Sequence, residues 1–156
     1  MAHHFDKLTI RTAGMLPTSV PNIRLYDITK NITGVVLASK IKHGIVVAQS
    51  LHTTAGLLVN ENEDGLLQND FPNLLVSLCP EGTYTHDRPE RLATLTNEPV
   101  NGVSHLRAAL GLLPSVTLIV KHSVVQLGTW QALLFVDCDP VHREERFVDV
   151  LVLGEA

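Results

Sequence analysis

The amino-acid sequence predicts a mixed α+β protein with a strand-rich, aliphatic core. Hydrophobic residues make up 45% of the 156 residues but aromatic residues only 4%, so aliphatic side chains must supply most of the buried surface. The C-terminal part alternates short apolar runs with turns, a pattern typical of strands. A chain of this length can bury a sizeable core, and we expect residues 1–156 to form a single domain.

The N-terminal half predicts three strands and one helix. We expect strands at Phe5–Arg11, Ile45–Leu51 and Ala55–Val59 and a helix at Asp27–Ser39. Asp27 is a suitable helix cap, and apolar residues recur at helical spacing behind it. The polar link His52-Thr53-Thr54 joins the second and third strands. It is either a hairpin turn or, as we favour, a bend or bulge within one long strand.

The second half predicts two helices followed by strands. The stretch Gly65–Leu78 is helical in pattern, although Pro72 predicts an interruption and a second start capped by Asp70. The long polar segment Tyr84–Asn101 is of a kind that often carries function. The remaining elements are a helix at Val103–Leu110 and strands at Ser115–Val120, Val124–Leu127, Ala132–Asp137 and Arg146–Leu153. The last strand is almost continuously apolar, which predicts burial on both faces or cover by another subunit.

Charge and composition argue against several classes of partner. The net charge is −4 and the basic residues are scattered, so we expect no nucleic-acid partner. No apolar run is long enough to cross a bilayer, and the N-terminus lacks the pattern of a signal peptide. Cys79 and Cys138 lie far apart and outside any Cys-x-x-Cys motif. We therefore expect a cytoplasmic protein with two buried free thiols and no membrane partner.

Three histidines in polar settings, His52, His86 and His105, are the main candidates for a shared site. Imidazole is the commonest protein ligand of zinc, and three protein ligands plus water form a usual catalytic zinc site. The spacing matches no local zinc motif, and the residues alone favour a surface or packing role for each histidine. The other internal histidines, His43, His122 and His142, lie in turn-like contexts and are expected at the surface.

An acid and amide cluster follows the strand that ends at Val59. Asn60, Glu61 and Asn62 offer acceptors and amide donors for substrate groups, and Glu61 is placed to act as a general base. The alternative is a loop that caps the next helix, with Asp64 in the capping role.

Two further motifs are candidates for substrate binding. Thr53 and Thr54 can bond a phosphate, or can simply be strand threonines. In Gly128-Thr129-Trp130-Gln131, the only tryptophan of the chain either stacks on a ligand ring, seals a subunit boundary or packs in the core. Arg88, Arg91 and Arg107 can neutralise phosphate, although arginines in polar loops are mostly solvated.

Five motifs occur in an order that resembles the YjbQ family, whose members are widely named secondary thiamine-phosphate synthases. The motifs are Ser50-Leu-His52-Thr-Thr-Ala-Gly, Asn60-Glu-Asn-Glu-Asp, Tyr84-x-His86-Asp87, Ser104-His105-Leu-Arg and Gly128-Thr-Trp-Gln. The resemblance spans nearly the whole chain. It implies an α+β fold in which an antiparallel β-sandwich is flanked by helices, usually assembled as a trimer. The segment Arg88–Val100 is longer than the family pattern suggests, which leaves the substrate open.

The resemblance also implies a site and an activity. His52, His86 and His105 would hold a divalent metal, with zinc as the expected ion. Residue chemistry adds the other roles: in the enzyme hypothesis Glu61 would be the catalytic base or would position the substrate. In the same hypothesis the substrate-binding residues would be Thr53, Thr54, Asn60, Asn62, Trp130 and Gln131. The implied reaction joins a pyrimidine diphosphate to a thiazole phosphate, as a main or a side activity.

Two other functions stay open at this point. One is a metal-binding or small-phosphate-binding trimeric protein without turnover. The other is a trimeric structural or interaction protein whose histidines only pack. An assay for turnover separates the enzyme from the binding protein, and metal analysis separates both from the third possibility.

Overall fold

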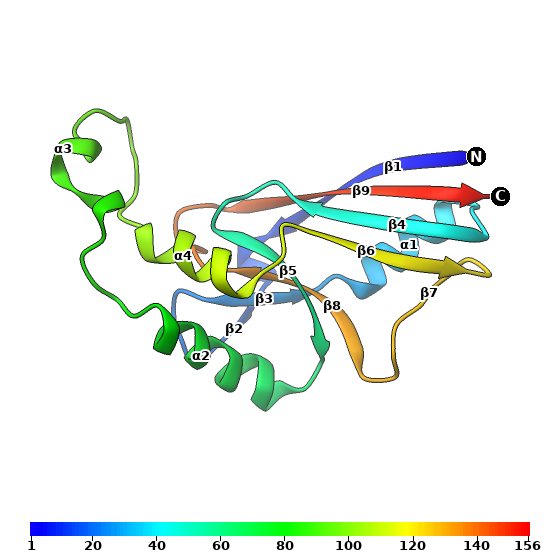
Figure 1. Cartoon of the computed structure of the whole chain (residues 1–156), viewed down its shortest axis with the longest axis horizontal. Coiled ribbons are helices and arrows are strands. Elements are labelled where there is room, and N and C mark those ends of the chain that lie inside the picture. The colour runs from blue at the N-terminus through cyan, green and yellow to red at the C-terminus, as the bar shows by residue number, and fades with distance from the viewer.

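Two antiparallel sheets pack face to face in the computed structural model, which describes residues 1–156 (Figure 1). The five-stranded sheet has the order β1-β9-β4-β6-β7 and the four-stranded sheet the order β2-β3-β8-β5. The strands of the first sheet are β1 Ala2–Arg11, β9 Glu145–Glu155, β4 His43–Ser50, β6 Ser115–Lys121 and β7 Val124–Val125. Those of the second are β2 Leu16–Pro17, β3 Arg24–Asp27, β8 Gln131–Asp137 and β5 Ala55–Glu61. The predicted antiparallel β-sandwich is therefore confirmed.

One helix packs against the core between the two sheets, and two others cover the outer face of the smaller sheet. The α-helices are α1 Thr29–Ser39, α2 Phe71–Leu78, α3 Pro89–Leu92 and α4 Gly102–Gly111. Short helical turns are η1 Thr12–Gly14, the π-helical η2 Leu66–Asp70 and η3 Thr85–Asp87. Figure 1 shows α3 and its flanking loops projecting at the end of the molecule opposite the two termini. No helix is both long and apolar enough to span a membrane.

The strand buried on both faces is β8. For β9 the prediction was burial on both faces or cover by another subunit; the first alternative is wrong within one chain, and the second stays a prediction. Leu133 and Phe135 of β8 face the core between the two sheets, together with Ile32 and Val36 of α1. Leu134 and Val136 face a second core beneath α2 and α4. Along β9 burial alternates strictly, with Val148, Val150 and Val152 inside and their neighbours half-buried on the outer face. The apolar run in β9 reflects a second, outer apolar surface.

The polar link after β4 is neither a hairpin nor a bulge. Because β4 and β5 belong to different sheets, residues 51–54 carry the chain from one sheet to the other. Ser50 secures this crossing, since its hydroxyl donates to the carbonyl of Ala55 at 2.9 Å and its own N–H donates to the carbonyl of Pro114. The crossing places His52, Thr53 and Thr54 at one end of the sandwich.

Helix starts also differ from the prediction. The carboxylate of Glu63, not that of Asp64, accepts the N–H groups of Gly65 and Leu66 at 2.9 and 2.7 Å. These two bonds lower the pKa of Glu63. Pro72 is accommodated by a change from π-helix to α-helix at Phe71 rather than by a break. The predicted free cysteines, Cys79 and Cys138, are both buried, and burial raises the pKa of Cys138 to about 12.

Candidate functional site

A small polar cavity of about 270 Å³ lies where the chain crosses between the sheets. Its wall combines the link after β4, the segment before α4, α4 itself and the loop that joins β8 to β9. Leu51 is the single hydrophobic side chain among the eleven that line it. The lining residues are Leu51, His52, Thr53, Thr54, Glu98, Pro99, Asn101, His105, Asp139, Arg143 and Arg146. Four of the predicted site residues therefore share one cavity.

His52 is held in a defined orientation by a strand far away in sequence. The backbone N–H of Phe147 donates to its Nε2 at 2.7 Å, and the two rings stack. Nε2 must be unprotonated to accept this bond, so neutral His52 carries its proton on Nδ1. Burial, with smaller contributions from the positive charges of Arg146 and Arg143, lowers the pKa of His52 to about 4. His52 is thus a neutral hydrogen-bond donor at pH 7.

One lining residue of the cavity, Arg146, belongs to a buried ion pair. Arg146 donates through Nε and Nη2 to the carboxylate of Asp137 at 2.6 and 2.8 Å, and through Nη2 to the carbonyl of Asp139 at 2.7 Å. Burial raises the pKa of Asp137, while the Arg146 pair acts in the opposite direction. Because such two-point pairing fixes both side chains, Arg146 is primarily a structural member of the wall.

His86 and His105 lie side by side, with ring centroids 4.8 Å apart. Nδ1 of His86 is 2.9 Å from the carboxylate of Asp87, which also accepts the N–H groups of Asn101 and Gly102 at the start of α4. Nε2 of His86 lies 3.8 Å from Oε1 of Glu98. Burial and the neighbouring His86 lower the pKa of His105. Asp87 therefore orients His86 so that Nε2 is the free ring nitrogen.

The histidines fit a divalent metal in part. His86 has the carboxylate-oriented geometry that protein metal ligands usually have, and His105 is beside it. His52 lines the same cavity as His105, but its Nε2 is already bonded to the N–H of Phe147. No group of three or more His, Cys, Asp or Glu side chains is arranged to hold a metal ion. The three-histidine metal site stays a prediction.

The other predicted site residues lie at the opposite end of β5. Strand β5 begins beside the cavity at Ala55 and ends at Glu61, which pairs with Gln131 of β8. Asn62 donates its N–H to the carbonyl of Trp130 at 3.1 Å. Within one chain, this group is not brought to the histidines. The members of the group are Asn60, Glu61, Asn62, Trp130 and Gln131.

Sequence reasoning missed the loop that follows β8. Arg143 lines the cavity, and Asp139 connects two of its neighbours by accepting Nδ2 of Asn101 at 2.8 Å and Nδ1 of His142. His142 is exposed at its surface, as predicted, but is anchored by this bond. The ion pair of Arg146 with Asp137 joins residues nine positions apart, and no local sequence motif predicts it.

Arg107, considered for phosphate binding, is instead a structural residue. It is fully buried, its Nε donates to the carbonyl of Cys79 at 2.9 Å, and its Nη1 donates to Glu81 at 3.0 Å. These bonds tie α4 to the end of α2. Arg91 pairs with Glu98 at 2.8 Å, so it positions the cavity lip rather than lining the cavity.

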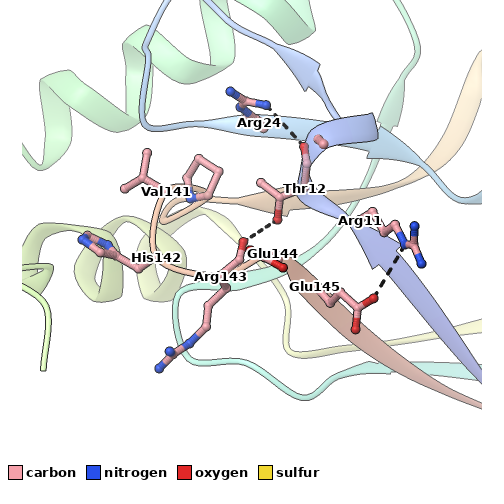
Figure 2. A pocket seen from close by; sticks show the side chains of 10 residues that line it. Arg11, Thr12, Arg24, Val141, His142, Arg143, Glu144 and Glu145 are labelled. Carbon is pink, nitrogen blue, oxygen red and sulfur yellow. Dashed lines mark hydrogen bonds and ion pairs between the residues drawn. The ribbon is translucent and has the colours of Figure 1, made fainter. Parts of the chain in front are cut away.

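A larger hollow of about 780 Å³ lies on the other side of the β8–β9 loop (Figure 2). Its arginines do not converge. Arg11 pairs with Glu145 at 3.6 Å, Arg24 donates to the carbonyl of Thr12 at 3.3 Å, and Figure 2 shows Arg11 and Arg143 extending in different directions. The smaller cavity, where donors meet, is the better candidate site.

These features define a small two-sheet α+β protein with a polar cavity lined by histidine, threonine and arginine. The sequence model of the UPF0047 protein YjbQ-like family matches residues 17–155. The chain belongs to the YjbQ-like UPF0047 family.

Relatives and solved structures agree with this assignment. A UPF0047 protein of Methanocaldococcus jannaschii is 34% identical over 128 residues, which cover 81% of this chain and 84% of the relative. A YbjQ-like protein of unknown function from Sulfolobus solfataricus P2 superposes with a TM-score of 0.79 at 28% identity, covering 98% of each chain. A protein of the same family from Clostridium acetobutylicum gives 0.74 at 26% identity, covering 95% of this chain and 99% of the other. Their names state no activity, so the similarity establishes family and fold.

Proposed function

We propose that the cavity binds the phosphate or diphosphate group of a small substrate. The observation that carries the proposal is the convergence of donors in one small, almost wholly polar space. His52 offers Nδ1–H, Thr53 and Thr54 offer hydroxyls, and Arg143 offers a guanidinium. Charge-assisted hydrogen bonds to phosphate are among the strongest in proteins, and arginine suits phosphate geometry.

The reaction that this site supports best is the one expected from the family resemblance. We propose a cytoplasmic transferase that joins a pyrimidine diphosphate to a thiazole phosphate, as a main or side activity. The thiazole nitrogen forms a bond to the pyrimidine methylene carbon, and the bond from that carbon to the diphosphate oxygen breaks. The leaving oxygen takes the electron pair, so the enzyme must stabilise negative charge on the diphosphate.

The chain's own residues divide this task. Arg143 and His52 would bind the leaving diphosphate, and Thr53 and Thr54 would fix its orientation. Asp87 holds His86 so that Nε2 is free beside His105. A divalent cation such as zinc at His86 and His105 would supply further positive charge. His52 would join it as a third ligand only after releasing the N–H of Phe147.

Turnover with the two phosphorylated substrates tests the proposal. Arg143→Ala should raise KM for the diphosphate substrate by about 10- to 100-fold, because a hydrogen bond to a charged group contributes about 1.5–3 kcal/mol. Arg11→Ala, which removes an exposed arginine of the outer hollow, is the matched control and should leave KM unchanged. Chromatography of the condensed product gives the rate.

Two outcomes would change the account. Binding of the diphosphate substrate without any product would favour the alternative, a non-catalytic binding protein for small phosphates. Equal kinetic constants for Arg143→Ala and Arg11→Ala would remove the cavity from the function altogether.

A further inference from the structure

The two halves of the predicted site are separated by the full length of β5. Thr54 precedes the strand at the cavity, whereas Glu61 ends it. The six steps from Ala55 to Glu61 span about 20 Å at the usual rise of a strand. Side chains so far apart cannot touch the same small substrate. If both halves serve one site, they must come from different copies of the chain.

The far half forms an exposed tip of defined composition. We define the tip as Asn60–Asp64 and Thr129–Gln131, together with Asp27. Asn62 links its parts, because its Nδ2 donates to the carboxylate of Asp27 at 2.9 Å and its N–H donates to Trp130. Figure 1 shows the end of β5 and the loop before β8 at the lower edge of the molecule, far from α3.

Trp130 is the residue of the tip that indicates a contact with another protein surface. It is the only tryptophan, and 74% of its surface is exposed. A large aromatic side chain gains free energy when it leaves water, and such residues are enriched where proteins meet. Gly128 and Gln131 hold the loop in place, since the side chain of Gln131 accepts the N–H of Gly128 at 2.8 Å. The tryptophan is thus presented on an ordered loop.

The acidic tip is also complementary in charge to Arg143 at the cavity mouth. The tip carries four carboxylates, those of Asp27, Glu61, Glu63 and Asp64. No lysine or arginine occurs in residues 59–70 or 126–131. At the cavity, Glu98 is paired with Arg91 and Asp139 accepts Nδ2 of Asn101, whereas the guanidinium of Arg143 is outside the buried ion pair and is the positive charge that faces a docking tip. Opposite potentials of this kind steer and orient association.

We propose that the tip of one copy docks at the cavity mouth of a second copy, so that Trp130 and Glu61 of one chain complete the site begun by His52 and His105 of the next. Each copy then uses two different surfaces, which is a head-to-tail contact. Such contacts close into a ring when the rotation permits, and a trimer is the ring that we expect. The proposal rests on the proposed function for what the composite site binds. Its test does not, because it needs no substrate.

The single tryptophan makes the contact measurable by fluorescence. In the wild-type assembly, Trp130 should emit at shorter wavelength and be quenched by acrylamide several-fold less than in Arg143→Glu, where the mouth repels the tip. Lys42→Glu, an equal charge reversal at an exposed residue of the turn before β4, should behave as wild type. Arg143→Ala is the milder second variant, and light scattering on the same samples reports the size of the assembly.

Mixed assemblies show which chain provides the mouth. Arg143→Glu chains are refolded with an excess of Trp130→Phe chains, which do not fluoresce from this position but keep a normal mouth. The proposal requires the remaining tryptophan to regain its protection. Unchanged quenching in the mixture would mean that Trp130 senses only its own chain and would overturn the proposal. An intact wild-type oligomer with a freely quenched Trp130 would overturn it too, because assembly would then use another surface.

Discussion

The hydrogen bond from the backbone of Phe147 to His52 determines what that histidine can do. The sequence identifies His52 as a site residue from its polar setting between two apolar runs. It cannot identify the tautomer, because the partner N–H lies 95 residues away in β9. The bond makes Nδ1 the donor and leaves no free lone pair on the ring in its neutral form. A residue predicted as a metal ligand is therefore better suited to bind an anion.

The lowered pKa of His52 makes a prediction about stability and pH. The pKa is about 4 in the folded chain against an ordinary value of 6.5. Between these pH values the unfolded chain binds a proton at His52 that the folded chain does not. The free energy of unfolding is therefore unaffected by protonation of His52 above pH 6.5 and decreases as the pH falls from 6.5 toward 4. His52→Gln should flatten this part of the profile, measured by urea unfolding at several pH values.

The control for that profile is a histidine elsewhere on the surface. His122 is exposed and has a φ of 51°, a conformation that asparagine tolerates well. His122→Asn should keep the wild-type profile. If His52→Gln and wild type instead lost stability in parallel between pH 6.5 and 4, the buried, neutral state assigned to His52 would be wrong.

Other residues of the site could not be predicted from sequence patterns, because their hydrogen-bond partners are also distant in the sequence. Asp139 joins Asn101 and His142, and its bond to Asn101 spans 38 residues. Arg107 looks like a phosphate-binding arginine beside His105, yet it is buried against Cys79 and Glu81, more than 25 residues away. Local composition gives the residue type, but the partner depends on the tertiary fold.

At the scale of elements, the positions of strands and helices could be predicted more reliably than their surroundings. Every long element occurs where apolar periodicity and turn residues place it. The exchange of roles between β8 and β9 shows the limit. Both strands are apolar runs, and only the packing of α2 and α4 on the smaller sheet decides that β8 is covered twice. Similarly, Glu63 and Asp64 are both acidic residues before a helix, and backbone geometry selects Glu63 as the cap.

The contact between β4 and β9 depends on two facing glycines. Gly44 and Gly154 are register partners, and a Cβ added to Gly44 would lie only 1.9 Å from the carbonyl oxygen of Leu153. Gly44→Ala should therefore push the strands apart and lower the free energy of unfolding by about 1–3 kcal/mol, the usual cost of overpacking. Chemical denaturation measures the change.

A second glycine provides a control of opposite sign. Gly34 lies in the exposed middle of α1, and a Cβ there meets nothing within 4 Å. Gly34→Ala should raise the free energy of unfolding by about 0.5–1 kcal/mol, because alanine loses less backbone entropy in a helix. Similar effects of the two substitutions would show that close approach of β4 and β9 is not what Gly44 provides.

At the scale of the whole molecule, the topology determines which of the sequence motifs lie close together in space. The predicted motifs are real features of the chain, but the sandwich places them at two ends of β5. Sequence order alone cannot show this, because it does not say that β4 and β5 enter different sheets. The outer face of the larger sheet adds a related observation. Phe5, Leu151 and Val47 form one row across it, and Leu153, Ile45 and Ile119 form another. A broad apolar face of this kind favours self-association.

The central claim is that the cavity beside His52 and His105 binds a phosphate-bearing ligand. A titration with inorganic pyrophosphate, followed by NMR of the histidine imidazole groups, tests it most directly. Binding should shift the signals of His52 and His105 together and leave those of His43 and His122, at the far end of the larger sheet, in place. The shifts should be lost in Arg143→Ala. Unshifted His52 and His105 signals at saturating pyrophosphate, or shifts confined to His43 and His122, would contradict the account.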